Sequence, residues 1–273
     1  MYKRYYDIDV DAKAYANRIV KAGGRIPSDI GSVSDFIRRL KAYNYYNSLI
    51  EGFCFRGLQN AGIGSIAYGL KQYNGILING PTWKDNGIDL GDADNSRIIE
   101  APVVLSSNPI PLTYIFIGSG SRNVKVAGEN LFGHFQRLEY FTPEFFSIQG
   151  LSSRFRGVFD SSIVPEQIFH DNSGTSSFPS TRDTFFCVQA VFRQTNISFS
   201  RNGAAFSTSS TLNNIGYQGS SRLILGGRSQ SNQPVQQFYG GIISAVFIFQ
   251  GEIDQANIYN LYKGTAGKGL GLP

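Results

Sequence analysis

The sequence is poor in charge and in sulfur. Only 16% of the 273 residues are charged, and the chain contains two cysteines, two histidines and one methionine. Cys54 and Cys187 stand far apart, each within an apolar run, and we expect both to be buried free thiols that behave as small hydrophobes. A disulfide between them has no supporting pattern, and no spacing typical of metal ligands occurs. The chain therefore needs a core built from other residues, and at this length it can bury one.

Long apolar runs and basic clusters are also missing. No stretch approaches the roughly 18 apolar residues of a membrane-spanning helix, so we predict no membrane partner. The net charge of +5 is carried by scattered side chains with only short pairs such as Arg38–Arg39, which argues against a nucleic-acid partner. The first 13 residues lack the apolar core of a secretory signal. We expect the protein to be made in a cytoplasm and to stay there or to leave by another route.

Aromatic residues and glycines are abundant instead, with 21 Phe, 15 Tyr and 31 Gly, as is typical of an all-β chain with many turns. Residues 184–192, "TFFCVQAVF", are almost entirely apolar, like a strand buried on both faces. Asn202–Gly203 lies between two alternating segments and supplies the two positive φ angles of a type I′ hairpin. Many short strands at intervals of about 8–12 residues predict a β-sandwich or jelly roll.

The first 45 residues have helical periodicity. Apolar positions from Asp11 to Ala22 fall on one helix face, and Gly23–Gly24 ends that helix. Ser32 and Asp35 resemble a capping box, which predicts a second helix with Ser32 as its N-cap. Residues 44–80 follow no clear period. We predict a helical hairpin with a connecting segment over residues 1–74 and a β-sandwich domain over residues 75–273, so that loss of residues 1–45 leaves the sandwich folded.

Glu252 and Asp254 pose the question of catalysis, because paired carboxylates beside a strand are typical of sandwich-fold glycosidases. A retaining glycosidase needs two carboxyl groups about 5–5.5 Å apart, and the next position on the same face is Ala256, which cannot act as an acid or a base. The strand pattern also breaks at Gly251. We therefore predict no catalytic residue and no enzyme activity, and we expect Asp254 to cap a short helix over residues 253–262.

Three groups of residues are candidates for binding. An amide-rich loop could hold a sugar or a partner chain, or be a solvated hairpin loop; its candidate contacts are Arg228, Gln230, Asn232, Gln233 and Gln236. An acidic cluster could bind calcium, or be an acidic loop without metal; it comprises Asp89, Asp92, Asp94 and Asn95. Aromatic residues near the N-terminus could form an assembly contact or pack the hairpin onto the sandwich; they are Tyr5, Tyr6, Tyr15, Phe36, Tyr45 and Tyr46. Beyond that calcium, no cofactor is predicted. Trp83 could stack on a sugar or belong to the core.

The C-terminal part resembles the laminin-G-like, concanavalin A-like jelly-roll superfamily. The residues that carry the resemblance are the Asn202–Gly203 hairpin, "LILGG" at 223–227, "FYGGIISAVFIF" at 238–249 and Leu261–Tyr262, together with "TWKDNGI" at 82–88. The similarity covers roughly residues 75–265. It implies a mainly β fold, a concanavalin A-like sandwich preceded by the small helical hairpin, and it says less about function than about fold.

Residues 14–41, "AYANRIVKAGGRIPSDIGSVSDFIRRLK", are similar to a helical segment found ahead of such domains in bacteriophage and prophage structural proteins. The combination implies a non-enzymatic virion protein of a capsid decoration, fibre or tail. Its partners would be other virion proteins, bound through the N-terminal segment, and it would be oligomeric within the assembly. The alternative is a lectin module that binds a cell-surface glycan.

Overall fold

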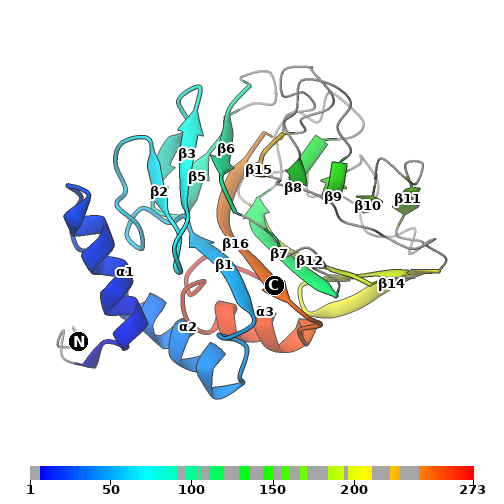
Figure 1. The fold of residues 1–273 in the computed structure, drawn as a ribbon, viewed down its shortest axis with the longest axis horizontal. Helices are drawn as coiled ribbons and strands as arrows, with labels where there is room; N and C mark the ends of the chain where they lie inside the picture. Colours follow the sequence, from blue (N-terminus) through cyan, green and yellow to red (C-terminus); the bar gives the residue numbers. More distant parts are fainter. Residues whose placement is uncertain are drawn as a thin grey trace.

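A computed structural model of the chain describes residues 7–91, 96–103, 105, 111–119, 129–135, 144–150, 155–159, 167–170, 184–193, 196–210, 222–227 and 240–273. In the strands between residues 129 and 170 the description covers the backbone only. The described residues form two antiparallel sheets packed as a sandwich, with two N-terminal helices and one C-terminal helix (Figure 1). The mainly β sandwich preceded by a helical hairpin, expected from the sequence, is confirmed.

The first sheet has eight strands in the order β14-β13-β12-β7-β16-β5-β4, with β1 also paired to β16. Its strands are β1 (Leu49–Cys54), β4 (Thr82–Lys84), β5 (Gly87–Asp89), β7 (Leu112–Ser119), β12 (Phe185–Phe192), β13 (Asn196–Arg201), β14 (Ala204–Ser210) and β16 (Ile242–Gln250). The second sheet follows the order β11-β10-β9-β8-β15-β6-β3-β2. Its strands are β2 (Ile66–Tyr68), β3 (Asn74–Ile78), β6 (Ile98–Ala101), β8 (Glu129–Phe135), β9 (Glu144–Gly150), β10 (Phe155–Phe159), β11 (Gln167–His170) and β15 (Arg222–Leu225).

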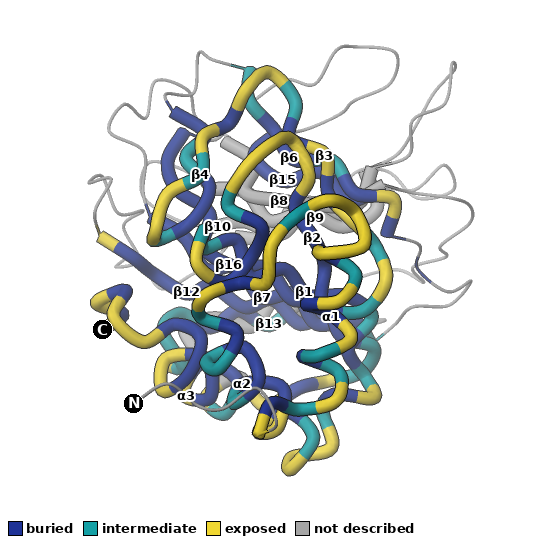
Figure 2. The backbone as a smooth tube through the Cα atoms, turned by 90° about the vertical axis from the view of Figure 1, so that its left-hand side faces the viewer, coloured by how far each residue is buried: buried dark blue, intermediate teal, exposed yellow. Residues whose placement is uncertain are grey.

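The central strands of the first sheet are buried on both faces. In β7, Tyr114 and Phe116 point into the core between the two sheets, whereas Ile115 and Ile117 belong to a second core beneath the helices. Every residue of β12 is also buried, which confirms the prediction made from its continuous apolar sequence. Figure 2 shows β7, β12 and β16 as buried backbone between the helices and the second sheet. The molecule therefore has three layers.

The helices form the outer layer on the first sheet. They are α1 (Val10–Lys21), α2 (Ile30–Ala42) and α3 (Gln255–Lys263). The ring of Phe36 in α2 lies 4.9 Å from that of Phe247 in β16 and 5.7 Å from that of Tyr262 in α3, between ring centroids. This aromatic cluster joins both ends of the chain to the sheet.

Two local predictions about turns hold. Gly23 has a φ of +88° and the Gly24 amide returns to the Ile19 carbonyl at 2.9 Å, so the glycine pair ends α1 as expected. Asn202 and Gly203 have φ angles of 50° and 83° between β13 and β14, as the type I′ hairpin requires. Short-range chemistry decided both turns.

The predicted start of α2 is wrong. The helix begins at Ile30 after Asp29, and Ser32 lies inside it, donating a 2.7 Å hydrogen bond from its hydroxyl to the Asp29 carboxylate. Asp35 lies inside the helix as well, and its carboxylate is 3.8 Å from the guanidinium of Arg38, one turn further along. The Asp29 amide donates to the carbonyl of Leu58 at 2.8 Å, a contact between distant segments that fixes the helix start and that no local pattern reveals.

The sandwich also begins earlier than the expected boundary at residue 74. β1 pairs with β16 in the first sheet, and β2 pairs with β3 in the second. The segment that followed no period, residues 44–80, therefore contributes one strand to the first sheet and two strands, β2 and β3, to the second. Within the described residues, no helix is long and apolar enough to cross a membrane.

Candidate functional site

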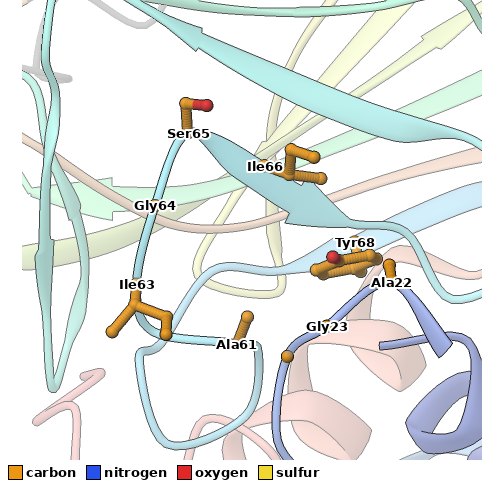
Figure 3. A pocket seen from close by; sticks show the side chains of 9 residues that line it. Ala22, Gly23, Ala61, Ile63, Gly64, Ser65, Ile66 and Tyr68 are labelled. Carbon is orange, nitrogen blue, oxygen red and sulfur yellow. The ribbon is translucent and has the colours of Figure 1, made fainter. Parts of the chain in front are cut away.

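A pocket of about 270 Å³ lies between the end of α1 and the chain leading into β2 (Figure 3). Helix α1 ends at its Gly23 turn, and β2 is the last strand of the second sheet, so the pocket opens at a sheet edge. It is lined by Ala22, Gly23, Gly24, Ala61, Ile63, Gly64, Ser65, Ile66 and Tyr68. None of these residues carries a charge. A mainly apolar lining with a few polar atoms is the usual character of a small-molecule site.

The loop that forms one wall is held by its backbone. Gly62 has a φ of +72°, and a Cβ there would lie 2.7 Å from the carbonyl oxygen of Gly57, so glycine is required. The indole Nε1 of Trp83 donates a 2.9 Å hydrogen bond to the carbonyl of Gly64. Trp83 is partly buried and packs against the core between the sheets, which agrees with its reading as a core residue. Trp83 contacts the pocket wall at the backbone carbonyl of Gly64.

Asn60 fixes the position of Tyr68. The buried Asn60 amide nitrogen donates to the carbonyls of Cys54 and Tyr68, at 3.1 and 2.9 Å. The Asn60 amide oxygen accepts from the backbone amides of Ala61 and Tyr68, each at 3.0 Å. The backbone amide and carbonyl of Tyr68, at the open edge of β2, are therefore both hydrogen-bonded to the side chain of Asn60.

The side chain of Tyr68 brings the main polar atom to the pocket. The residue is 4% exposed, and its hydroxyl points into the pocket in Figure 3. Among the described residues this hydroxyl has no hydrogen-bond partner. Two of the lining isoleucines are exposed, Ile63 at 56% and Ile66 at 40%. The pocket thus offers a fixed hydroxyl beside exposed apolar side chains.

Sequence reasoning missed this pocket. Its residues come from two segments about 40 positions apart, and "AGIGSIAYG" at 61–69 reads only as a glycine-rich loop. The one available signal was the placement of Ile63 and Ile66 within this glycine-rich segment.

The aromatic residues proposed for assembly are largely inside the molecule, which corrects that expectation. Tyr15 and Phe36 are fully buried and Tyr46 is nearly so, in the core shared by the helices and the first sheet. They pack the hairpin onto the sandwich, the second of the two readings. Tyr45 is partly exposed and its ring stacks on that of Tyr43, with centroids 5.9 Å apart. Tyr5 and Tyr6 lie outside the described residues.

The other two candidate groups fall mostly outside the described residues. This holds for the whole amide-rich group (Arg228, Gln230, Asn232, Gln233, Gln236) and for Asp92, Asp94 and Asn95 of the acidic cluster. Asp89 lies in β5, and its carboxylate accepts a 2.8 Å hydrogen bond from the amide of Gly91. The described part of the chain contains no group of three His, Cys, Asp or Glu side chains placed to hold a metal ion. Calcium binding stays a prediction.

Glu252 and Asp254 have separate roles in the fold. The guanidinium of Arg193 binds Glu252 and lowers the pKa of its carboxyl group, mainly through the hydrogen bond between them. Asp254 is the N-cap of α3, where its carboxylate accepts from the amide of Asn257 at 3.1 Å, as predicted. Cys54 and Cys187 are free and buried, and burial raises the pKa of each thiol to about 12.

Comparison with known proteins places the fold and goes no further. No family model matches the sequence, and no curated protein matches it. Among solved structures, a Trypanosoma rangeli sialidase in complex with sialic acid is 10% identical over 90% of this chain and 40% of that one, with a TM-score of 0.56. The same sialidase with 2,3-difluorosialic acid gives 13% identity, 96% and 38% coverage, and a TM-score of 0.55.

A third match is domain 4 of the extracellular arabinanase AbnA from Geobacillus stearothermophilus, solved with arabinotriose. It is 13% identical over 77% of this chain and 86% of that one, with a TM-score of 0.46, and we draw nothing from so weak a likeness. This chain spans about two fifths of the sialidase chains. The two sialidase matches show that part of the sialidase chain shares the fold of this protein.

Proposed function

We propose that this protein is a glycan-binding β-sandwich module that carries out no catalysis itself. The observation that carries the proposal is the match of nearly the whole chain to part of a sialidase solved with sialic acid. The resemblance of residues 75–265 to the laminin-G-like superfamily supports the same reading, because a lectin module is the alternative function predicted from the sequence. An uncharged pocket at a sheet edge supplies a place for a small ligand.

The positions of the two carboxylates first considered for catalysis agree with a binding role. The paired carboxylates of Glu252 and Asp254 are occupied by an arginine and a helix terminus, so they offer no acid and base pair for hydrolysis. A binding module needs only a positioned set of hydroxyl, amide and apolar groups.

A glycan array tests the proposal directly. The full chain, fluorescently labelled, is applied to neutral and acidic glycans, with the heat-denatured chain as control, and each positive glycan is titrated by calorimetry. We expect saturable binding to a limited set of glycans. Retention of no glycan above the denatured control would overturn the proposal.

The virion role, the virion location and the N-terminal attachment remain proposals from the sequence, because none of the comparisons bears on them. Purified particles from a producing host test them, since a virion component must co-purify with capsid or tail at a fixed ratio. Because Tyr15 and Phe36 are buried, an attachment surface would have to use other residues, such as the partly exposed Tyr45.

A further inference from the structure

We infer that the pocket between α1 and β2 binds a single neutral sugar ring, with Tyr68 as its central hydrogen-bonding residue. This inference rests on the proposed function and deepens it, because it names the site and the class of sugar. The lining residues of the pocket are all described, and none of them belongs to the amide-rich loop or the acidic cluster suggested by the sequence.

The hydroxyl of Tyr68 is available to a ligand. The described part of the chain leaves two fully buried side-chain atoms without a partner, Gln59 Oε1 and Tyr262 Oη, and the Tyr68 hydroxyl is not one of them, so it is open to solvent in the pocket and can exchange water for a ligand group. The Tyr68 ring is held in place by the Asn60 clamp on its backbone, and its hydroxyl faces the pocket (Figure 3). A phenolic hydroxyl both donates and accepts, so it can pair with a sugar hydroxyl in either direction.

The backbone at the edge of β2 adds further hydrogen-bonding groups to the pocket. The Leu77 amide donates to the Ser65 carbonyl at 2.8 Å, so residues 65 and 67 bond to β3 while Ile66 and Tyr68 turn their backbone groups away from it. The backbone amide and carbonyl of Tyr68 are hydrogen-bonded to Asn60. The backbone amide and carbonyl of Ile66 lie at the open edge beside the pocket, where they add one donor and one acceptor.

The walls of the pocket combine apolar and polar surface. Ile63 and Ile66 expose apolar surface next to these polar groups. A sugar ring has C–H faces and hydroxyl edges, so it can contact both kinds of surface at once. With about 270 Å³, the pocket lies just below the range of roughly 300–1,000 Å³ common for drug-sized ligands, which suits one ring better than a longer chain.

The absence of charge in the lining favours a neutral sugar over an acidic one. No lining residue is charged, so a sugar carboxylate would lose water without gaining a cation. Lys21 and Arg25 are exposed near the end of α1, but neither lines the pocket. The site therefore favours neutral sugars over sialic acid, although the matched sialidases were solved with sialic acid or its difluoro derivative.

The test uses the full chain and defined probes. Methyl glycosides of glucose, galactose, mannose and arabinose, together with N-acetylneuraminic acid, are examined by saturation-transfer NMR, and the strongest glycan from the array is titrated. Tyr68→Phe removes only the hydroxyl, and we expect it to weaken binding about 2- to 12-fold, the loss of one neutral hydrogen bond. Ile63→Ala removes an exposed wall and is expected to weaken binding without loss of folding.

Tyr73→Phe is the matched control, because it removes a hydroxyl from the β2–β3 turn outside the pocket. Unchanged affinity in this control, loss in the two pocket variants and no signal from N-acetylneuraminic acid would support the inference. If the chain binds a glycan on the array, and Tyr68→Phe and Ile63→Ala bind that glycan as tightly as the unmodified chain, the assignment of the binding site to this pocket is wrong. In that case the proposed function stands. Binding of N-acetylneuraminic acid that depends on Tyr68 would overturn the preference for neutral sugars. Absence of any binding glycan would remove the proposed function itself.

Discussion

The guanidinium of Arg193 holds the carboxylate of Glu252 with two contacts of 2.7 Å, Nε to Oε1 and Nη2 to Oε2. The third nitrogen of the same group donates to the hydroxyl of Ser198 at 2.6 Å. This arrangement links the end of β12 to β13 and to the connection before α3. The carboxylate that first suggested catalysis thus anchors the last helix to the sheet.

This ion pair predicts a pH-dependent effect of Glu252→Gln. The pKa of Glu252 is lowered in the folded chain, so its contribution is fully present above the ordinary glutamate value of about 4.3 and is lost as the pH falls below it. Because the carboxylate is half exposed, we expect a loss of at most about 1 kcal/mol at pH 7. Urea unfolding at pH 7 and pH 3 measures it, and an equal difference at both values would contradict the assignment.

Glu51 predicts a larger effect in the interior. The carboxylate of this buried residue accepts four backbone amides, from Gly52 and Lys71 through one oxygen and from Gln72 and Tyr73 through the other, at 2.7–2.9 Å. Glu51→Gln replaces one carboxylate oxygen by an NH₂ group, which cannot accept a hydrogen bond. Two of the four backbone amides therefore lose their acceptor in either orientation of the side chain. We expect unfolding to become easier by at least about 2 kcal/mol.

Hydrogen exchange locates this effect. The amides of residues 71–73 should lose protection first in Glu51→Gln, because the substitution releases their turn. Glu100→Gln, at a partly exposed position of β6, is the control for the same substitution away from this turn. Equal stability of the two variants would show that the carboxylate does not hold the turn.

Deletion of residues 1–45 is expected to unfold the sandwich, contrary to the prediction from sequence. The deletion removes α1 and α2, which bury Tyr15, Ile19, Phe36 and Leu40 in the core shared with the first sheet. Each such side chain contributes about 1.5–3 kcal/mol, and four of them approach the whole stability of a typical domain, about 5–15 kcal/mol. Near-ultraviolet circular dichroism and dye binding report the outcome.

A chain that lacks only residues 1–6 keeps both helices and serves as the control for this deletion. A monodisperse product without residues 1–45 that unfolds cooperatively would mean that the helical layer is dispensable. In that case the sandwich would fold independently of the helical hairpin, as the sequence predicts.

The cysteines should be unreactive until the chain unfolds. Burial raises the pKa of both thiols to about 12, so at pH 8 almost none is present as thiolate, the nucleophilic form. We expect no reaction of the native chain with Ellman's reagent and release of two thiols per chain in guanidinium chloride. Rapid reaction of one thiol in the native chain would place that cysteine at the surface.

Local chemistry explains which parts of the fold the sequence predicts. The Asn202–Gly203 hairpin, the Gly23 turn and the Asp254 cap depend on neighbouring residues alone, and all three are confirmed. The start of α2 was misplaced because Asp29 is bonded to Leu58, far along the chain. Likewise, β1 and β2 are strands because of partners that no short window contains.

The candidate site was harder to predict for the same reason. Tyr15 and Phe36 were noted for their aromatic rings, but a ring in a sequence does not reveal whether it faces solvent or another layer. The pocket at Tyr68 depends on the packing of α1 against β2, which periodicity cannot place.

The clamp of Asn60 on Tyr68 has a consequence for self-association. An exposed sheet edge is a template for pairing with another molecule, and natural proteins blunt such edges. Asn60 stands where a neighbouring strand would bond, so a foreign strand would first have to displace its four hydrogen bonds. What remains open at Ile66 is one residue long, room enough for a small molecule but too short to seed the growth of a fibre.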